Sequence, residues 1–507
     1  MRKSVSYTIL ILTLFLVACG RNRPQTDEHY PSYQNYEIDN YYGATTLAGE
    51  AVFSVGEPNP PEPTIKDLLL YDLDYLMQLF EDAYSYINVL YRTRGIDIRV
   101  LGQNAREIIE NYPYSMQEFA YSLGISLEDM PELDAQVFWG ILRGEIFHPA
   151  FFPFFAHTQI TNFYTFRVHS TWNRRDSSIP RIRFNRRAFD NITSALFYRE
   201  MDILWSNLLD DPALFQFYFR LAPLQNEASE IQVVNTSAIT ATILEEGRVA
   251  YLQVSSFMQD MWEFDREHSG TFIDFYNAIQ DYEHLIIDIR DNTGGGLELP
   301  ITHIMLPLSP EPDNLPNMPL YILYTGSELG RRFSELDVES MHIPEYRPSQ
   351  FPQSYSPLLI EEILNTGSLS SLNTDDLHLL VYGYRIYHSV MGLNNSRFAL
   401  PHIPFSGQMW LLICSRNYSA AAMFARFARY TGFATLVGEP VGGAYAVTIA
   451  TPMPLPNTGI VVVWDVGFIT DVYGRALNEF PTQPHYFNRP GMDALETVLA
   501  MIAESRG

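Results

Sequence analysis

The stretch from Met409 to Tyr445 constrains the fold more than any other part of the chain. It opens with an apolar run, Met409–Cys414, which is short enough to be a buried strand. After a polar break, Ala420–Tyr430 has the apolar period of a helix, and the following Thr-Gly pair is a typical helix end. Ala434–Val437 then predicts a second strand that leads into a glycine-rich turn. The stretch therefore predicts a strand, a helix and a strand in close succession.

Ser419 falls at the junction between the first strand and the helix. The backbone amides of a first helical turn have no partner within the helix, and the helix dipole favours negative charge there. Such a position suits a nucleophile. A serine at the start of a helix can equally be an N-cap with no chemical role. The stretch alone leaves both interpretations open.

The pattern before this stretch also alternates between strand and helix. Val249–Phe257 predicts a strand, Thr271–Tyr282 a helix, and His284–Arg290 a buried strand, with another strand at Leu320–Tyr324. Strands that alternate with helices indicate an α/β core. We therefore expect an α/β core over residues 248–507, interrupted by an insertion at about 326–405 that could cover the site.

The region before the core divides into two parts. Residues 64–155 have apolar side chains at three- and four-residue spacing, which predicts an N-terminal helical domain. Residues 156–247 form a connecting region with a short alternating stretch and a basic patch. Three histidines lie at or near the junction of these parts, at positions 148, 157 and 169.

The first residues have the pattern of an export signal. A basic start at Arg2 and Lys3 precedes an apolar run, Tyr7–Val17, that is too short for a stable membrane-spanning helix. The run ends in Leu-Val-Ala followed by Cys19, which resembles the lipobox of bacterial lipoproteins. An ordinary signal peptide with an incidental cysteine is the alternative. The resemblance implies a signal peptide over 1–18, a lipidated Cys19, a flexible tether over 19–63, and an extracytoplasmic protein anchored to the bacterial cell membrane.

Charge and lysine usage narrow the chemistry. The net charge of −26 makes nucleic acid and anionic membrane surfaces poor partners for the body of the protein. The chain has two lysines, Lys3 and Lys66, so no lysine lies in the α/β core. The histidines and Cys414 do not have the spacing of metal ligands. We expect neither a metal nor another cofactor.

A glycine-rich turn, Asp291–Gly296, directly follows the predicted strand that ends at Arg290. Glycines allow backbone amides to approach a ligand closely, so the turn could be an oxyanion hole, a phosphate cradle or only a tight turn. A phosphate loop of the usual kind needs a Gly-Lys-Ser/Thr sequence, which is missing here.

Four segments resemble the C-terminal processing, or tail-specific, serine peptidases, the family that includes the tricorn protease core. They are RVAYLQVSSF, DIRDNTGGG, SAAAMFARFARYTGFATLVGEPVGG, and YGRALNEFPTQPHYF with the closing GMDALETVL. They occur in the family's order between about Arg248 and Ile502. The resemblance implies a crotonase/ClpP-like spiral β-α-β core that hydrolyses peptide bonds through an acyl-enzyme.

Carried over residue by residue, the resemblance assigns the nucleophile to Ser419. It assigns the oxyanion hole to the amides of Ala420 and of Gly294 or Gly295. In the Ser–Lys members of the family a lysine follows the Gly-Glu-Pro turn, but Ala444 stands at that position here. A Ser–Lys dyad is therefore not expected.

A Ser-His-Glu branch of the same family offers another base. Its histidine precedes the core, and Ala156-His157-Thr158 is the most similar sequence in this chain. Its glutamate lies about sixty residues after the serine, which matches Glu479. The resemblance thus implies that His157 is the base and that Glu479 orients it. His148 and His169 are the alternatives for the base, and Ser327 is the competing serine.

We therefore expect a serine endopeptidase with a peptide or protein substrate and a lipid anchor. The alternative from another class is a catalytically inactive peptide-binding lipoprotein on the same scaffold, in keeping with Ala444 in place of the lysine. An esterase with the same nucleophile is a further alternative. The discriminating observation is whether His157 and Glu479 converge on Ser419. The sequence does not predict the oligomeric state or the cleavage preference.

Overall fold

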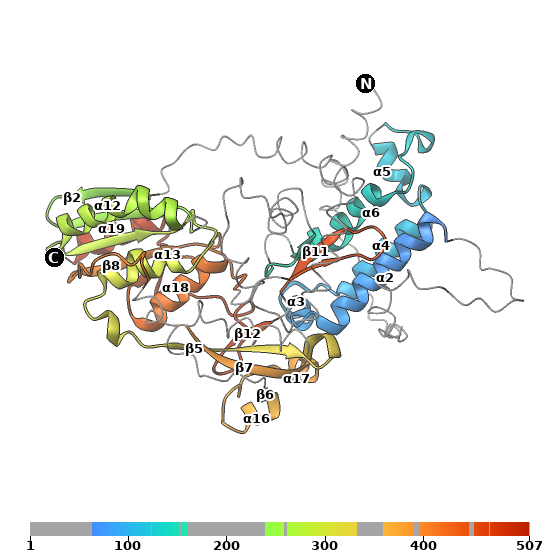
Figure 1. Cartoon of the computed structure of the whole chain (residues 1–507). Helices are drawn as coiled ribbons and strands as arrows, with labels where there is room; N and C mark the ends of the chain where they lie inside the picture. The colour runs from blue at the N-terminus through green and yellow to red at the C-terminus, as the bar shows by residue number, and fades with distance from the viewer. Residues whose placement is uncertain are drawn as a thin grey trace, which may run out of the picture.

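The computed structural model describes most of the chain from Pro63 onward (Figure 1). The described residues are 63–122, 124–151, 155–160, 239–257, 261–331, 358–388, 396–445, 451–465 and 467–505. The predicted signal peptide and all but the last residue of the predicted tether lie outside them, as does most of the predicted connecting region. Those domain bounds stay predictions.

The predicted N-terminal helical region is present. Its first helix, α2, begins after Thr64, where Thr64 and Asp67 form a reciprocal capping box, and it buries Leu69, Leu73, Leu76 and Phe80 along one face. The elements are α2 (Ile65–Ala83), α3 (Ile87–Arg94), α4 (Ile98–Glu110), η3 (Tyr114–Met116), α5 (Gln117–Ser122), η4 (Leu127–Asp129), α6 (Ala135–Leu142), η5 (Arg143–Phe147) and α7 (His148–Phe151).

The predicted α/β core is built on a six-stranded sheet with strand order β13-β9-β8-β4-β3-β2. Every neighbouring pair is parallel except β2–β3 at one edge. The strands are β2 (Ile239–Glu245), β3 (Val249–Val254), β4 (His284–Asp288), β8 (Gln408–Ile413), β9 (Thr435–Gly438) and β13 (Tyr486–Phe487). In a parallel sheet the carboxyl ends of the strands share one edge, so the turns after β4 and β8 are neighbours.

Helices cover both faces of this sheet, as buried parallel strands require. Helix α19 (Ala494–Glu504) packs Val498 and Ile502 against Ile286 and Leu412 on one face. The alternate residues, such as Leu285 and Leu411, join the larger core that also contains α12 (Met261–Ile279) and α18 (Ser419–Thr431). The remaining helices of this part are α13 (Glu298–Pro300), η6 (Ile301–Met305), α14 (Leu306–Leu308), η7 (Pro312–Asn314), α16 (Ile360–Leu364) and α17 (Thr374–Leu379).

Two antiparallel sheets connect the core to the helical region. The first has the order β12-β5-β7-β6, so the described part of the predicted insertion contributes strands to a sheet with β5 and β12. The second has the order β1-β11-β10. The strands are β1 (Gln159–Ile160), β5 (Met318–Thr325), β6 (Leu358–Leu359), β7 (Leu380–His388), β10 (Thr451–Pro454), β11 (Val461–Trp464) and β12 (Phe468–Asp471).

A buried carboxylate ties the helical region to the β10–β11 hairpin. Asp72 of α2 accepts hydrogen bonds from the backbone amides of Asn457 and Thr458, both at 2.8 Å, and from both of their side chains. A buried carboxylate is tolerated when its lone pairs are satisfied in this way. The hairpin is therefore held against α2, and strand β1 adds to its free side at β11.

Candidate active site

Ser419 lies where the sequence predicted, six residues after the end of β8 and at the first residue of α18. Helix α18 buries Ala420, Ala421 and most of its other apolar residues, and it ends at Gly432 in the left-handed conformation. The N-cap is Tyr418, and it makes no side-chain capping bond. Ser419 is therefore not the N-cap that the sequence left open, and its hydroxyl is available for another partner.

Ser419 and residues of two nearby loops have a strained, left-handed backbone. Four non-glycine residues among those described have positive φ, and three of them are Ala156 (56°), Ser419 (51°) and Ala444 (48°). The amide of Ser419 donates to the carbonyl of Gly443 at 3.2 Å. This bond joins the loop of Ser419 to the loop of Ala444. Left-handed backbone costs a non-glycine residue roughly 1–2 kcal/mol, and such strain clusters at functional sites.

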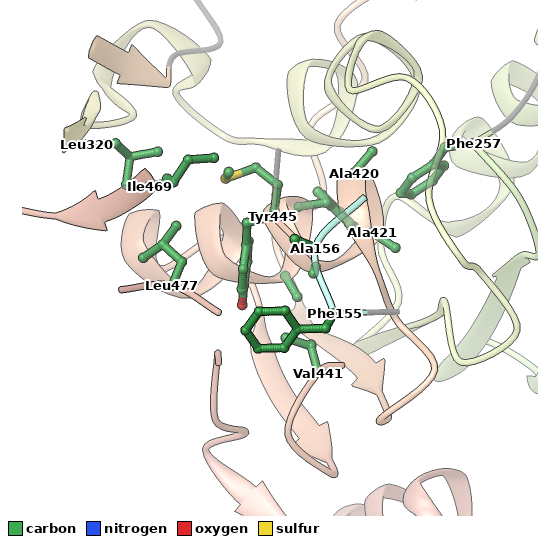
Figure 2. Packing of buried hydrophobic residues seen from close by; sticks show 14 of the residues in the cluster. Phe155, Ala156, Phe257, Leu320, Ala420, Ala421, Val441, Tyr445, Ile469 and Leu477 are labelled. Carbon is green, nitrogen blue, oxygen red and sulfur yellow. The ribbon is translucent and has the colours of Figure 1, made fainter. Parts of the chain in front are cut away.

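His157 reaches Ser419 from the segment between the helical region and β1. Its Nε2 lies 3.1 Å from Ser419 Oγ, which is a hydrogen-bonding distance. The preceding residues Phe155 and Ala156 belong to the same apolar cluster as Ala420, Val441 and Tyr445, as Figure 2 illustrates. The helical region thus supplies the packing that carries the imidazole to the core.

The register of β1 on β11 places a carboxylate behind the ring. Gln159 pairs with Val463 and Ile160 with Val462 in an antiparallel ladder. The same register, continued by two residues, sets His157 opposite Asp465. The backbone amide of His157 donates to Asp465 Oδ2, and the same oxygen lies 3.5 Å from His157 Nδ1.

The charge of Asp465 shifts the titration of His157. Burial of the ring favours the neutral form and lowers the pKa of His157, but the negative charge of Asp465 outweighs this effect, so the pKa lies above its ordinary value. The Asp465 side chain is 3% exposed, whereas that of His157 is 31% exposed. The imidazole side chain is thus partly exposed, and the charge beside its Nδ1 is buried.

Two of the predicted oxyanion donors have free amides, and one does not. The amide of Gly294 donates to Asn292 Oδ1 at 2.9 Å. Phe257 bonds the carbonyl of Gly294 and the amide of Gly296, and among the described residues the amide of Gly295 between them has no partner. The amide of Ala420 likewise makes no hydrogen bond with the described residues. Gly295 and Ala420 are therefore the better pair of donors.

Two buried asparagines fix the glycine turn against the serine loop. Asn417 Nδ2 donates to the carbonyls of Ile289 at 2.5 Å and Asn292 at 2.9 Å. Its Oδ1 accepts from the amide of Cys414 at 2.7 Å. Asn292 Nδ2 in turn donates to the carbonyl of Val254 at 3.1 Å. The turn after β4, the loop after β8 and the end of β3 are therefore joined by side-chain amides.

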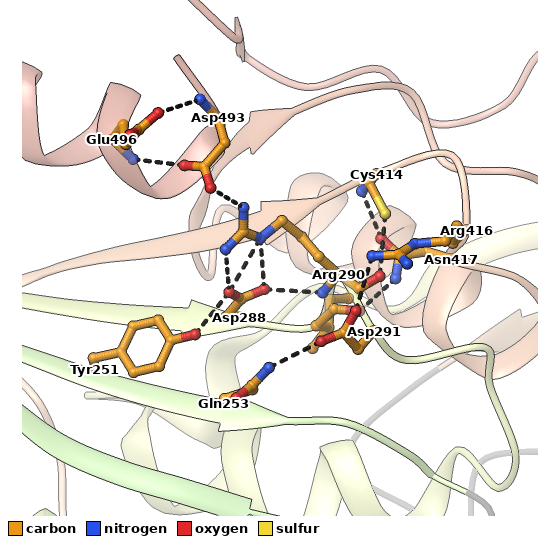
Figure 3. A network of polar contacts seen from close by, with 11 residues as sticks. Tyr251, Gln253, Asp288, Arg290, Asp291, Cys414, Arg416, Asn417, Asp493 and Glu496 are labelled. Carbon is orange, nitrogen blue, oxygen red and sulfur yellow. Dashed lines mark hydrogen bonds and ion pairs between the residues drawn. The ribbon is translucent and has the colours of Figure 1, made fainter. Parts of the chain in front are cut away.

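Asp288 and Arg290 shape the start of this turn. Asp288 accepts from Tyr251 Oη at 2.8 Å and from Arg290 Nη2 at 2.7 Å (Figure 3). Arg290 Nη1 also bonds Asp493 at 3.0 Å, the N-cap of α19. This ion-pair network connects β3, β4 and α19 at the carboxyl edge of the sheet.

Glu479 does not lie where the resemblance implied. Its carboxylate receives Arg92 Nε at 3.1 Å and Nη2 at 2.8 Å, and the same guanidinium binds Asp376. The carboxylate beside His157 is that of Asp465, so Asp465 replaces Glu479 as the candidate orienting group. Sequence reasoning missed Asp465. Its one signal is an acid at the end of a continuous apolar run, and pairing across some 300 residues cannot be read from a pattern.

The other sequence candidates have different surroundings. Ser327 Oγ donates to the carbonyl of Asp82 at 2.6 Å and accepts from the amide of Gly330 at 2.9 Å, so it works as a helix cap. His148 lies on α7, and His169 lies outside the described residues. Lys66 Nζ bonds the carbonyl of Glu110, and Ala444 is buried. Among the described residues, the one lysine, Lys66, is thus engaged at Glu110 and not at Ser419.

Two further predictions concern the membrane and metals. Cys19 lies outside the described residues, so lipidation stays a prediction. In the part of the chain that the structure describes, no helix has the length and apolar character needed to cross a membrane. The same part holds no cluster of three or more histidine, cysteine or acidic side chains arranged to bind a metal ion.

The α/β core is the part of the chain that matches a known protein family. Residues 248–318 and 358–486 match the sequence model of peptidase family S41. They include Ser419 and the glycine turn, whereas His157 precedes them. The resemblance that the sequence showed from Arg248 onward is thereby confirmed for the core.

Several solved structures are similar to the chain. Mature CPAF is 13% identical, with 83% of this chain and 93% of that chain covered at a TM-score of 0.43. A lipoprotein from Streptococcus agalactiae is 10% identical, with 89% and 99% covered at 0.40. The photosystem II D1 C-terminal processing protease is 13% identical, with 51% and 50% covered at 0.28. No curated protein matches the sequence.

Proposed function

We propose that this protein is a serine endopeptidase that hydrolyses peptide bonds through an acyl-enzyme. The observation that carries the proposal is the 3.1 Å approach of His157 Nε2 to Ser419 Oγ within an S41 core. A hydroxyl at hydrogen-bonding distance from an imidazole is the general signature of an activated nucleophile. The free amides of Gly295 and Ala420 support the same reaction.

Acylation begins when Ser419 Oγ attacks the carbonyl carbon of the scissile peptide bond. His157 Nε2 accepts the hydroxyl proton as the carbon–oxygen bond forms. The carbon–nitrogen bond then breaks, and the imidazolium returns the proton to the leaving amine. The product of this half-reaction is an ester between Ser419 and the acyl part of the substrate.

The negative charge that develops on the carbonyl oxygen needs donors that are already in place. The amides of Gly295 and Ala420 provide them, because neither is used within the described structure. One such donor typically contributes about 10²–10³-fold to the rate. The start of α18 adds a favourable dipole for the same charge.

Deacylation repeats these steps with water in place of the serine. His157 Nε2 accepts a proton from the water as its oxygen attacks the ester carbon. The bond to Ser419 Oγ then breaks, and the hydroxyl regains its proton from the imidazolium. All proton transfers use one ring nitrogen, and no cofactor is required.

Active-serine labelling tests this proposal. The full chain, purified in detergent, is treated with a fluorophosphonate probe beside Ser419→Ala, His157→Ala and Ser327→Ala variants. We expect labelling of the wild type and of Ser327→Ala, and loss of labelling in the other two. Ser327→Ala is the matched control, because Ser327 also follows a strand and opens a helix.

Two outcomes would oppose the proposal. Labelling that persists in Ser419→Ala would assign the nucleophile elsewhere. A folded wild type that is never labelled would favour the alternative of an inactive peptide-binding protein. A peptide library cleaved by the wild type and left intact by Ser419→Ala would separate a peptidase from an esterase.

We further propose that the protein is an extracytoplasmic lipoprotein anchored through Cys19. The basic start, the short apolar run and the cysteine that follows support this location. Acyl chains contribute roughly 0.8 kcal/mol per buried CH₂, so several chains on one cysteine anchor a protein durably. Cys19→Ser should move the protein from the membrane fraction to the soluble fraction, and unchanged fractionation would count against the anchor.

A further inference from the structure

We propose that Asp465 is the positioning residue of this site, which holds the His157 ring in the orientation and tautomer that catalysis needs. The inference rests on the proposed function, because it assigns the third member of the same catalytic group. In this proposal Asp465, directly after β11, takes the role that the family resemblance implied for Glu479.

The main chain fixes the carboxylate relative to the ring. The β1–β11 register sets His157 opposite Asp465, and Asp465 Oδ2 accepts the backbone amide of His157. The same oxygen lies 3.5 Å from Nδ1 of the ring. Catalytic hydrogen bonds are often long before substrate binds, so this distance suits a contact that tightens in the complex. The same oxygen, Asp465 Oδ2, therefore lies close to both the backbone amide and the ring of His157.

The surroundings direct the charge of Asp465 toward the imidazole. Among the described residues, His157 Nδ1 and Asp465 Oδ1 have no hydrogen-bond partner, and Asp465 is 2% exposed. A proton on Nδ1 is favoured beside this carboxylate, which leaves the lone pair of Nε2 facing Ser419 Oγ. That is the tautomer in which the ring can accept the serine proton.

Other titratable groups face this pair from the helical region. Tyr84 and Tyr86 are fully buried there, and burial, together with the charge of Asp465, raises the pKa of each well above the ordinary value. Both phenols therefore stay neutral across the working range. Arg94 of α3 lies over the ring of Phe155 at 5.0 Å, and Tyr418, beside the serine, also has a raised pKa because it is partly buried. Asp465 supplies the negative charge that acts on His157.

Glu479 is occupied by a different partner. Arg92 donates hydrogen bonds to Glu479 from two nitrogens, and to Asp376 from two nitrogens as well. A carboxylate held in such a fork would have to give up a charge-assisted pair before it could reach a histidine. Glu479→Gln is therefore the matched control for Asp465→Asn, since each change removes one negative charge and nearly preserves side-chain volume.

The rate of fluorophosphonate inactivation of the full chain between pH 5 and 9 tests the proposal. Inactivation requires neutral His157, so the rate should rise with a midpoint above pH 6.5 in the wild type. Asp465→Asn should lower this midpoint, because the charge that raises the pKa is gone and burial remains. It should also lower the plateau by about 10²–10⁴-fold, as expected for a misoriented base. Glu479→Gln should keep the wild-type midpoint.

A second readout does not depend on reactivity. The His157 resonance, assigned by comparison with His157→Gln, can be titrated by NMR in histidine-labelled wild type, Asp465→Asn and Asp465→Glu. We expect the Asn variant to titrate below the wild type and the Glu variant, which keeps the charge, to return toward it. An unchanged midpoint in Asp465→Asn, or a midpoint that moves only in Glu479→Gln, would overturn the proposal. Absent wild-type labelling would reject the proposed function alone, because the NMR titration would still test the pairing.

Discussion

Gly294 lies so close to Ser419 that a methyl group on its α-carbon would come within 2.8 Å of the serine Cβ and 2.7 Å of the Tyr418 carbonyl. Its φ of 113° is also unfavourable for any side chain. We therefore predict that Gly294→Ala displaces the serine loop. A shift of about 1 Å at such a position can cost on the order of 10²-fold in rate. The measurement is the inactivation rate with the fluorophosphonate probe.

Gly296→Ala is the control for this change. A methyl group there would meet one atom, the carbonyl oxygen of Phe257, at 4.0 Å, which is an ordinary contact. We expect it to react at close to the wild-type rate. Equal rates for Gly294→Ala and the wild type would show that the turn does not need to approach the serine closely.

Asn417 should be important for stability as well as for the site. Its side chain satisfies the carbonyls of Ile289 and Asn292 and the amide of Cys414, and Asn417 itself is fully buried. A buried polar group left without a partner costs about 1–3 kcal/mol. We predict that Asn417→Ala lowers the free energy of unfolding by about 3 kcal/mol and slows labelling of Ser419, because the turn and the loop are no longer joined.

Urea unfolding of Asn417→Ala beside Ser415→Ala measures this effect. Ser415 is exposed and bonds Glu439 at 3.2 Å on the surface, so its loss should change the free energy of unfolding by less than about 0.5 kcal/mol. A similar, small change in both variants would mean that Asn417 is not a structural link.

Local pattern and long-range pairing account for what the sequence did and did not predict. The strand before Ser419 and the helix after it were predicted within one or two residues, because a buried apolar run and a helical period are local signals. Glu479 matches the family pattern through its distance from the serine along the chain. Asp465 reaches the histidine through the register of β1 on β11, which depends on how two distant segments pack.

The free amides show the same limit. The sequence named Gly294 and Gly295 together, because three glycines in a turn look alike. The structure distinguishes them through Asn292, whose side chain accepts from the amide of Gly294, whereas the amide of Gly295 has no partner within the described part of the chain. An asparagine that caps its own turn is a common device, but its exact donor cannot be assigned from residue type.

Arg92 should stabilise the fold by holding two acids together. Its side chain is 18% exposed, and its partners Asp376 and Glu479 are 1% and 19% exposed. Removal of the guanidinium leaves a buried carboxylate next to a second one, and breaking a buried pair costs several kcal/mol. We predict that Arg92→Met lowers the free energy of unfolding by about 2–3 kcal/mol and that Asp376→Asn in that background restores part of the loss.

Chemical denaturation of these variants beside Arg99→Met tests the point. Arg99 pairs with Glu81 at 2.9 Å but is 48% exposed, so its removal should cost less than about 1 kcal/mol. If Arg92→Met and Arg99→Met unfold at the same denaturant concentration as the wild type, the fork on Glu479 is not a stabilising contact. Glu479 would then be free to serve another role.

His303 should make the protein less stable in mild acid. The ring is completely buried among Phe264, Phe272 and α12, and burial lowers its pKa to about 4 even though Asp265 lies 3.7 Å away. The unfolded chain has an ordinary histidine pKa near 6.5 and binds a proton at pH 5, whereas the folded chain does not. Stability from this group is therefore complete above pH 6.5 and declines as the pH falls toward 4. Between pH 7 and pH 5 the loss amounts to about 2 kcal/mol.

Urea unfolding of the wild type and of His303→Gln at these two pH values isolates the effect, because the other titrating groups are common to both proteins. We expect the wild type to lose about 2 kcal/mol more than the variant; an equal loss in both would mean that His303 is protonated in the folded protein.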